Sequence, residues 1–189
     1  MKFEPLSIPG TWEITLAPRG DERGYFMRTY DEALFADHGL STRWVQENQS
    51  LSGEVGIVRG LHFQTGEHAE TKLVRVLAGR VLDVIVDVRK GSPTFGKHVS
   101  VELSAIRQNA LYVPRGFAHG FCVLEAPAIV AYKVDHPYTP AAEGGLLWKD
   151  PALGIEWPIR DAVTSAKDAT WPGIHDLIPV VIPVELPTV

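Results

Sequence analysis

Histidine, lysine and tyrosine side chains that could transfer protons or hold charge occur on apolar, strand-like runs in the middle of the chain. His62 lies within residues 58–64, Lys72 begins the next run, and Tyr132 lies on a later one. Histidine titrates at about 6.5 and can accept a proton near neutral pH, whereas tyrosine, at about 10, stays protonated and can donate one. A prepositioned ammonium stabilises a developing oxyanion. These residue types fit acid–base chemistry that passes through an enolate.

The spacing of Arg59 and His62 predicts a local irregularity between them. On a regular strand alternate residues share a face, so these two side chains would point to opposite sides. Gly60 lies between them, and a glycine inside a strand often marks a bulge. We therefore expect a bulge at Gly60 that brings both side chains into one solvated cavity, because unpaired charges among apolar strands are costly.

Short strand-like runs separated by glycine or proline dominate the middle of the chain. They cover residues 72–77, 80–88, 98–103, 110–114, 121–124 and 128–134. This pattern favours an all-β sandwich or jelly roll over βαβ units. We expect short helices at residues 31–38, capped by Asp31, and at residues 161–167, and an extended, proline-containing tail over residues 174–189.

Length and composition limit the possible classes of protein. The 189 residues suit one domain, with a core at about residues 45–140 on which an N-terminal arm and a C-terminal segment pack. The net charge of -5 argues against nucleic acid or anionic membranes as main partners. The single cysteine, Cys122, excludes an internal disulfide and a cysteine metal cluster. The sequence shows no signal segment and no membrane span, so we expect a cytoplasmic protein.

Two stretches resemble the paired motifs of the cupin superfamily, with one metal ligand replaced. The first motif has His62, but Gln64 stands where a second histidine is usual, and the second motif keeps His119. A transition-metal site generally needs three or four converging ligands. Recruitment of Glu67 or Glu70 beside the two histidines is one alternative, which Gln64 disfavours. The other alternative is that His62 and His119 are buried histidines with a purely structural role.

Seven blocks, in the same order, strongly resemble the dTDP-4-dehydrorhamnose 3,5-epimerase family. They are residues 21–26 (DERGYF), 46–50 (QENQS), 58–64 (VRGLHFQ), 72–76 (KLVRV), 87–96 (DVRKGSPTFG), 114–121 (PRGFAHGF) and 148–151 (WKDP). The likeness extends from about Arg19 to Pro172. It implies a homodimer of cupin-type jelly rolls (double-stranded β-helices) with a few short helices and an active site without metal or cofactor.

The resemblance also implies roles for individual residues. His62 would remove the proton beside the C4 ketone of a nucleotide-linked 4-keto-6-deoxyhexose, with Asp168 orienting it. Tyr132 would return a proton on the opposite face, and Lys72 would stabilise the enolate oxygen. The expected result is inversion at C3 and C5. The residues expected to bind the nucleotide sugar are Arg23, Phe26, Arg28, Gln46, Asn48, Arg59, His119, Glu143 and Lys167.

Three positions depart from the family pattern. Arg28 replaces a glutamate, Glu47 an aspartate, and Asp135 a small residue or threonine. The change at Arg28 substitutes a donor-only guanidinium for an acceptor-only carboxylate. If this side chain meets the base, it suits cytosine better than thymine, and we hypothesise a CDP-linked sugar. The alternative is that Arg28 meets a phosphate or a neighbouring acid and the nucleotide is dTDP.

Other functions stay open at this level. A close variant inverts only C3 or only C5. A metal-dependent cupin oxygenase or isomerase would require a complete ligand set, and a non-catalytic sugar-nucleotide binder would be expected to lack His62 or Tyr132. Taken one at a time, Lys72, Tyr132 and Asp168 suit ordinary structural roles. The ordered blocks favour the catalytic interpretation.

Overall fold

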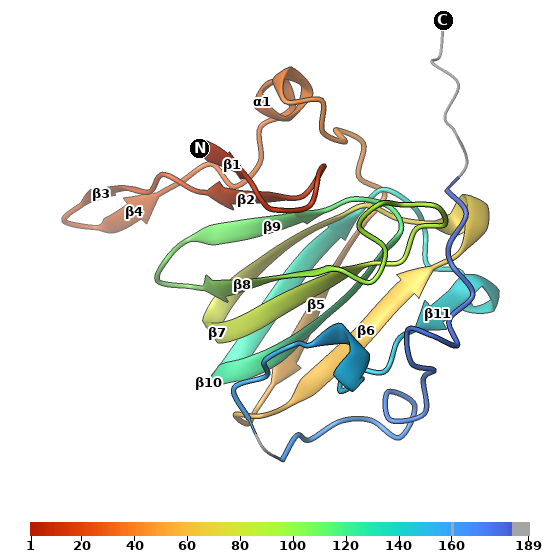
Figure 1. Ribbon diagram of the computed structural model, residues 1–189. Helices are drawn as coiled ribbons and strands as arrows, with labels where there is room; N and C mark the ends of the chain where they lie inside the picture. Colours follow the sequence, from red (N-terminus) through yellow and green to blue (C-terminus); the bar gives the residue numbers. More distant parts are fainter. Residues whose placement is uncertain (160, 183–189) are drawn as a thin grey trace, which may run out of the picture.

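The computed structural model describes residues 1–159 and 161–182 of the chain, and this part is rich in β-strands (Figure 1). The predicted all-β, cupin-type jelly roll is confirmed. The strands are β1 (Lys2–Pro5), β2 (Trp12–Thr15), β3 (Arg19–Asp21), β4 (Gly24–Phe26), β5 (Gln46–Ser52), β6 (Val58–Gln64), β7 (Lys72–Asp87), β8 (His98–Ser104), β9 (Asn109–Val113), β10 (Phe117–Val134) and β11 (Glu143–Gly145). The helix α1 (Glu32–Asp37) and the 3₁₀ turns η1 (Gly66–His68), η2 (Pro140–Ala142) and η3 (Pro151–Leu153) complete the elements.

Two long strands, β7 and β10, take part in both sheets of the jelly roll. The first part of β7 pairs with β9 and with the last part of β10, which also pairs with β5; β2 and β1 extend this sheet, called sheet I here. The last part of β7 pairs with β8 and with the first part of β10, which pairs with β6, and β6 pairs with β11; this is sheet II. All of these pairs are antiparallel, and the two sheets face each other.

Both long strands change sheet near Gly79. Gly79 has a φ of 72°, and a Cβ there would collide with the carbonyl oxygen of Glu125. The β7–β10 register also shifts between Glu125 and Ile129. Glycine adopts this backbone conformation without a steric penalty, so the bend that creates the two facing sheets depends on it.

Alternation along β7 divides its side chains between two apolar layers. Val81 and Ile85 belong to the core between the sheets, whereas Val84 and Val86 belong to a second core on the outer face of sheet II. Successive strand residues point to opposite faces, and a strand buried on both faces therefore carries apolar residues almost continuously. The chain after β11 covers the second core with Leu146, Trp148, Leu153, Ile174 and Val180.

The outer face of sheet I is covered by the N-terminal part of the chain. Leu73 and Tyr112 of the sheet pack with Ile14 and with Phe35 of α1. The predicted helix is confirmed, including its cap, because the Asp31 carboxylate accepts a hydrogen bond from the Leu34 amide at 3.2 Å.

The helix predicted at residues 161–167 is wrong. Val163 instead forms a parallel bridge with Ile57, and its amide and carbonyl bond to Gly56 and Val58. These bonds hold the segment extended against the start of β6. The extended tail predicted from residue 174 is only partly confirmed. Residues 174–176 form a turn, and Val180 further along forms a parallel bridge with Arg89. The last two prolines of the tail lie outside the described residues.

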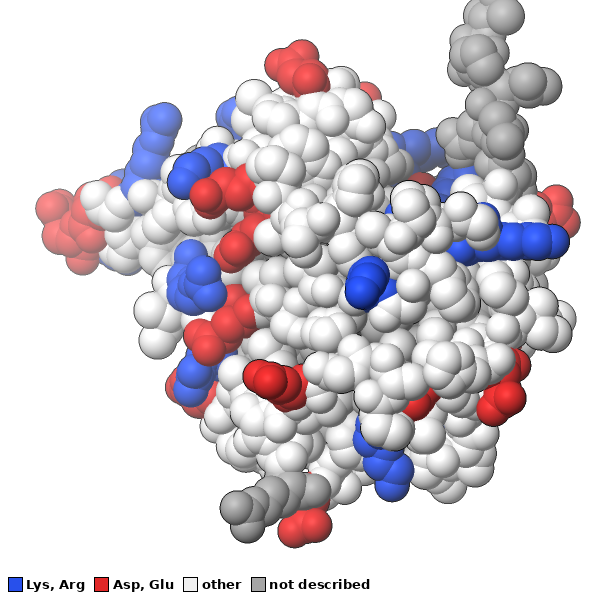
Figure 2. Space-filling view, viewed as in Figure 1, with Lys and Arg blue, Asp and Glu red and all other residues white. Residues whose placement is uncertain are grey.

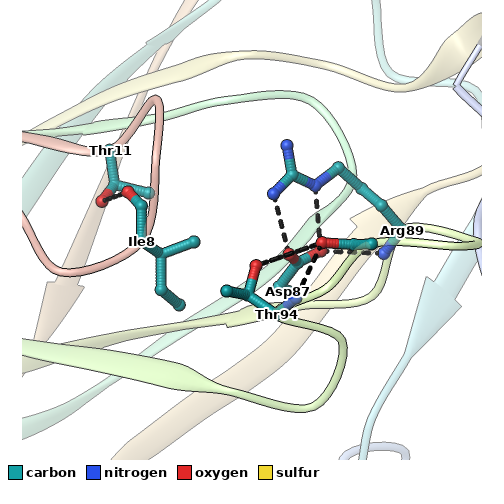
Figure 3. Close-up of polar contacts among 6 residues, drawn as sticks. Ile8, Thr11, Asp87, Arg89 and Thr94 are labelled. Carbon is teal, nitrogen blue, oxygen red and sulfur yellow. Dashed lines mark hydrogen bonds and ion pairs between the residues drawn. The ribbon is translucent and has the colours of Figure 1, made fainter.

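The loop after β7 is held by Asp87, whose side chain is fully buried. Its carboxylate accepts hydrogen bonds from the Arg89 guanidinium at 2.9 and 2.7 Å and from the Thr94 hydroxyl at 2.6 Å (Figure 3). The Ser92 hydroxyl donates to the same carboxylate at 2.6 Å. Burial opposes ionisation, but the bonds from Arg89 and the two hydroxyls outweigh it and lower the pKa of Asp87. The block at residues 87–96 that resembles the family therefore has a structural role, because its hydrogen bonds hold the loop after β7 in place.

The surface in Figure 2 carries mixed charge. Basic and acidic side chains lie next to each other along the edge that carries the N-terminal strands, and uncharged side chains cover most of the middle of this face. Among the helices of residues 1–159 and 161–182, none is long and apolar enough to span a bilayer.

Candidate active site

A cavity of about 570 Å³ lies between the two sheets. His62 and His119 come from β6 and the first part of β10 in sheet II, whereas Lys72 and Tyr132 come from β7 and the last part of β10 in sheet I. Polar side chains thus enter the cavity from both walls. The other lining residues are Ser50, Ile57, Val58, Arg59, Gly120, Phe121, Glu143, Val163, Thr164, Ser165, Lys167 and Asp168.

His62 is paired with Asp168, which the turn after Ser165 brings to the cavity. Nε2 of His62 lies 2.6 Å from Oδ1 of Asp168, and the other carboxylate oxygen accepts a hydrogen bond from the Gly60 amide at 3.3 Å. Burial opposes ionisation of Asp168, but the bonds from His62 and Gly60 outweigh it and lower the pKa of this carboxyl. The ionised carboxylate favours the proton on Nε2, so Nδ1 keeps a lone pair.

The predicted bulge at Gly60 is confirmed. Between the pairs His62–His119 and Arg59–Phe121, β6 has one more residue than β10. Gly60 has a φ of 119°, and a Cβ there would lie 2.6 Å from the backbone of β10. The bulge changes the alternation, so Arg59 and His62 both line the same cavity.

Tyr132 faces the cavity from sheet I. Burial raises the pKa of its phenol, the negative charge of Glu70 raises it further, and Arg59 acts in the opposite direction. The phenol therefore stays protonated well beyond neutral pH and has a proton to donate.

Lys72 begins β7 and is almost buried. Its Nζ lies 3.1 Å from Oε1 of Glu70, and the two side chains are 9% and 11% exposed. The ammonium thus reaches the cavity with a carboxylate behind it.

His119 and Arg59 are also held by hydrogen bonds. Nε2 of His119 lies 2.8 Å from Oδ1 of Asp83, a carboxylate with no exposed surface. Arg59 donates to the Ser52 hydroxyl and the Leu51 carbonyl, both at 3.1 Å. These supports place an imidazole and a guanidinium at the cavity wall, and the guanidinium can bind oxygen atoms of an anionic ligand.

The rim of the cavity carries a second ionic cluster. Oε2 of Glu143 accepts hydrogen bonds from Lys167 at 2.6 Å and from the Tyr138 hydroxyl at 2.7 Å. Lys167 also lies over the Trp171 ring, 5.5 Å from its centroid. Burial opposes ionisation of Glu143, and the bonds from Lys167 and Tyr138 outweigh it and lower the pKa.

Gln64 points away from the cavity, into a set of structural hydrogen bonds. Its Nε2 lies 3.0 Å from both the His68 carbonyl and Oε2 of Glu70, and its Oε1 accepts from the Thr139 amide at 2.6 Å. Within the described part of the chain, no three histidine, cysteine or acidic side chains come together as a metal site.

Five of the residues expected to bind substrate lie outside this cavity. Arg23 and Phe26 belong to the β3–β4 hairpin, which extends away from the two sheets (Figure 1); the Arg23 side chain is 84% exposed and Phe26 is 74% exposed. Arg28 bonds to Asp31 at 2.6 Å. The remaining two lie on β5: Asn48 pairs with Tyr132 of β10, and Gln46 accepts a hydrogen bond from the Tyr138 amide at 2.8 Å.

Sequence reasoning missed Asp83 as the partner of His119, and it considered Glu70 only as a possible metal ligand and not as the partner of Lys72. Asp83 could have been noticed, because it is a charged residue between apolar neighbours on a strand and shares a face with Val81 and Ile85. Glu70 gave no comparable signal, since it precedes the strand and follows a polar turn. The hydroxyls of Ser50 and Thr164, which also line the cavity, were missed as well.

The fold is a cupin-type jelly roll, and its cavity brings together an Asp-bound histidine, a tyrosine and a lysine, which are residue types that can transfer protons and hold charge. The family model described as dTDP-4-dehydrorhamnose 3,5-epimerase matches residues 5–176, and the chain belongs to this family.

Individual relatives agree over most of the chain. A dTDP-4-dehydrorhamnose 3,5-epimerase of Sinorhizobium fredii is 47% identical over 178 residues, which cover 94% of this chain and 91% of the relative. The crystal structure of the enzyme of that name from Elizabethkingia anophelis superimposes with a TM-score of 0.89 at 44% identity, covering 93% and 97% of the two chains. A Legionella pneumophila dTDP-6-deoxy-D-glucose-3,5-epimerase, solved with dTDP-4-keto-L-rhamnose, gives a TM-score of 0.89 at 40% identity and covers 94% of each chain.

Proposed function

We propose that this protein inverts C3 and C5 of dTDP-4-dehydro-6-deoxyglucose, a step of deoxysugar biosynthesis. The observation that carries the proposal is the placement of His62 and Tyr132 on opposite walls of one cavity. Lys72, at the start of β7, lines the same cavity. Family membership and the names of the relatives support the substrate class.

The proposed reaction begins with proton removal by His62. Nδ1 takes the proton from the carbon next to the C4 ketone, while Asp168 stabilises the imidazolium that forms. The electrons of the C–H bond form the enolate, and its oxygen carries the negative charge. Lys72 stabilises that oxygen, an effect on the order of 3 kcal/mol for a prepositioned donor.

The second half of the reaction delivers a proton to the other face. The Tyr132 hydroxyl protonates the enolate carbon and the C4 ketone reforms. The imidazolium of His62 then releases its proton to water and the phenolate regains one from water, so both groups are ready for the second carbon. Tyr132 and His62 approach from different sheets, so the new C–H bond forms opposite the one that broke. Arg59, His119 and Lys167 would hold the diphosphate and the sugar.

We propose dTDP as the nucleotide carrier. The contact between Arg28 and Asp31 supports the alternative in which this arginine meets a neighbouring acid, so it gives no reason to prefer cytosine. The names of the relatives also refer to dTDP sugars.

We further propose that residues 1–189 form one domain and that the enzyme works as a homodimer. The β3–β4 hairpin carries two of the expected substrate-binding residues, Arg23 and Phe26, away from their own cavity. In a dimer such a hairpin can reach the cavity of the other subunit. A mixture of His62→Ala and Arg23→Ala proteins should then regain activity that neither has alone, and no recovery together with monomers in solution would contradict the dimer.

We propose a cytoplasmic location, because a charged nucleotide diphosphate does not cross a bilayer unaided. Cell fractionation tests this proposal.

The experiment for the main proposal is conversion of dTDP-4-dehydro-6-deoxyglucose, with product stereochemistry read by NMR. The wild type should invert both carbons, and His62→Ala should invert neither. Inversion of one carbon only would favour the single-carbon variant, and faster turnover of the CDP-linked sugar would contradict dTDP. Full activity of His62→Ala would overturn the mechanism.

A further inference from the structure

Glu70 lies directly behind Lys72 at the start of β7. The distance of 3.1 Å between the carboxylate and the ammonium, and the burial of both side chains, make this a largely buried ion pair. A buried ammonium requires an opposite charge, and removal of one partner leaves the other uncompensated. Lys72 lines the cavity and Glu70 is outside the lining, so the carboxylate acts on a ligand only through its neighbours.

Gln64 fixes the orientation of the Glu70 carboxylate. Oε2 of Glu70 accepts a hydrogen bond from Nε2 of Gln64 at 3.0 Å, while Oε1 faces Lys72. Gln64 is itself buried and is held by the Thr139 amide at 2.6 Å and by the His68 carbonyl at 3.0 Å. The residue in the place of a cupin histidine therefore anchors the carboxylate that holds the lysine.

We propose that Glu70, oriented by Gln64, is a positioning residue that fixes the Lys72 ammonium toward the substrate oxygen. The inference rests on the proposed epimerase function. An ammonium has three N–H donors, so one bond to Glu70 leaves two for the developing enolate. The geometry is set before the substrate arrives, which reduces the reorganisation required during the reaction.

The charge of Glu70 also acts on the acid of the reaction. Burial is the main reason for the raised pKa of Tyr132, the charge of Glu70 raises it further, and Arg59 lowers it. Loss of the Glu70 charge should therefore lower the pKa of Tyr132, and the activity that requires the protonated phenol should fall at a lower pH. The charged or titratable groups that share the cavity with Tyr132 are Arg59, His62, Lys72, His119, Glu143, Lys167 and Asp168.

The test compares wild type with Glu70→Gln, which keeps the shape and removes the charge. We expect kcat to fall between about tenfold and 100-fold with a smaller change in KM. The alkaline limb of the kcat profile should move to lower pH. Glu70→Asp keeps the charge and shortens the reach, so it should lower kcat and keep the wild-type alkaline limb; it also serves if Glu70→Gln does not fold. Glu102→Gln, which breaks a part-exposed pair with Arg80, is the matched control and should change neither property.

A second measurement does not depend on turnover. Acetylation of Lys72 in the folded protein, followed by mass spectrometry, should be faster in Glu70→Gln than in wild type and unchanged in Glu102→Gln. A folded Glu70→Gln enzyme with wild-type kcat, pH profile and Lys72 acetylation would overturn the inference. If the wild type itself converts no sugar, the proposed function fails, and the reaction role of Glu70 fails with it, while acetylation still reports the ion pair.

Discussion

His62 and Tyr132 lie on different sheets of the jelly roll and line one cavity from opposite walls. The arrangement depends on the two long strands, since the first part of β10 is the neighbour of His62 in sheet II and the last part carries Tyr132 in sheet I. Inversion of a carbon requires hydrogen to leave from one face and arrive at the other. The fold therefore provides the separation that an epimerase needs.

Substitution of Asp168 tests the partner of the histidine. Asp168→Asn removes the charge that stabilises the imidazolium and presents an amide that can favour the wrong tautomer, so kcat should fall on the order of 10²–10⁴-fold. The measurement is steady-state turnover, with circular dichroism to verify folding. Asp161→Asn, an exposed carboxylate in the same segment, is the control and should keep wild-type activity. An Asp168→Asn enzyme with normal kcat would show that His62 works without this partner.

The pH profile tests the tyrosine acid. Burial and the nearby Glu70 raise the pKa of Tyr132 above its ordinary value, and the phenol acts in its protonated form. Activity should therefore persist through neutral and mildly alkaline pH and be lost only as the pH rises through this raised pKa. The residual activity of Tyr132→Phe should not show this fall at alkaline pH. If activity falls at the same alkaline pH in both enzymes, the titrating group is not Tyr132.

Gly60 should not tolerate a side chain. Gly60→Ala would place a Cβ 2.6 Å from the Gly120 Cα at a φ of 119°, so it should cost about 3 kcal/mol of stability and displace His62. Urea unfolding and turnover measure the two effects. Gly53→Ala is the control, because a Cβ there meets nothing within 4 Å. A stable and fully active Gly60→Ala protein would mean that the bulge is not required.

Asp87 should contribute to stability in a pH-dependent way. Its pKa is lowered in the folded protein, so its contribution is present above the unfolded value of about 3.9 and is lost as the pH falls through the folded pKa. At pH 7, Asp87→Asn should lower the free energy of unfolding by about 3 kcal/mol, because Arg89 loses its partner. The difference from wild type should shrink in acid. Urea unfolding at several pH values is the measurement, and the exposed Asp176→Asn is the control.

Local features of the fold could be predicted from the sequence. Asp31 capped α1 as expected, and the glycine at position 60 indicated the bulge that turns Arg59 toward the cavity. Both depend on residues close together in the chain. The segment at residues 161–167 could not be predicted in the same way, because its extended form is set by bonds to the start of β6, about 100 residues earlier.

The partners of the site residues were harder to predict for the same reason. Asp83 meets His119 and Gln64 meets Thr139 only after the strands have paired, and a single sequence gives no direct signal of such contacts. The role of Arg23 was also hard to predict from one chain, because in the proposed dimer its hairpin contributes to the site of the second subunit.

Hydrogen exchange in deuterated water tests the central claim most directly. Wild-type enzyme should incorporate deuterium at C3 and C5 with inversion. His62→Ala should incorporate none. Tyr132→Phe should still exchange hydrogen through His62 on one face, but inversion should be much reduced or lost at one carbon at least. If Tyr132→Phe inverts both carbons at the wild-type rate, the phenol is not the acid and the proposed arrangement of base and acid is wrong.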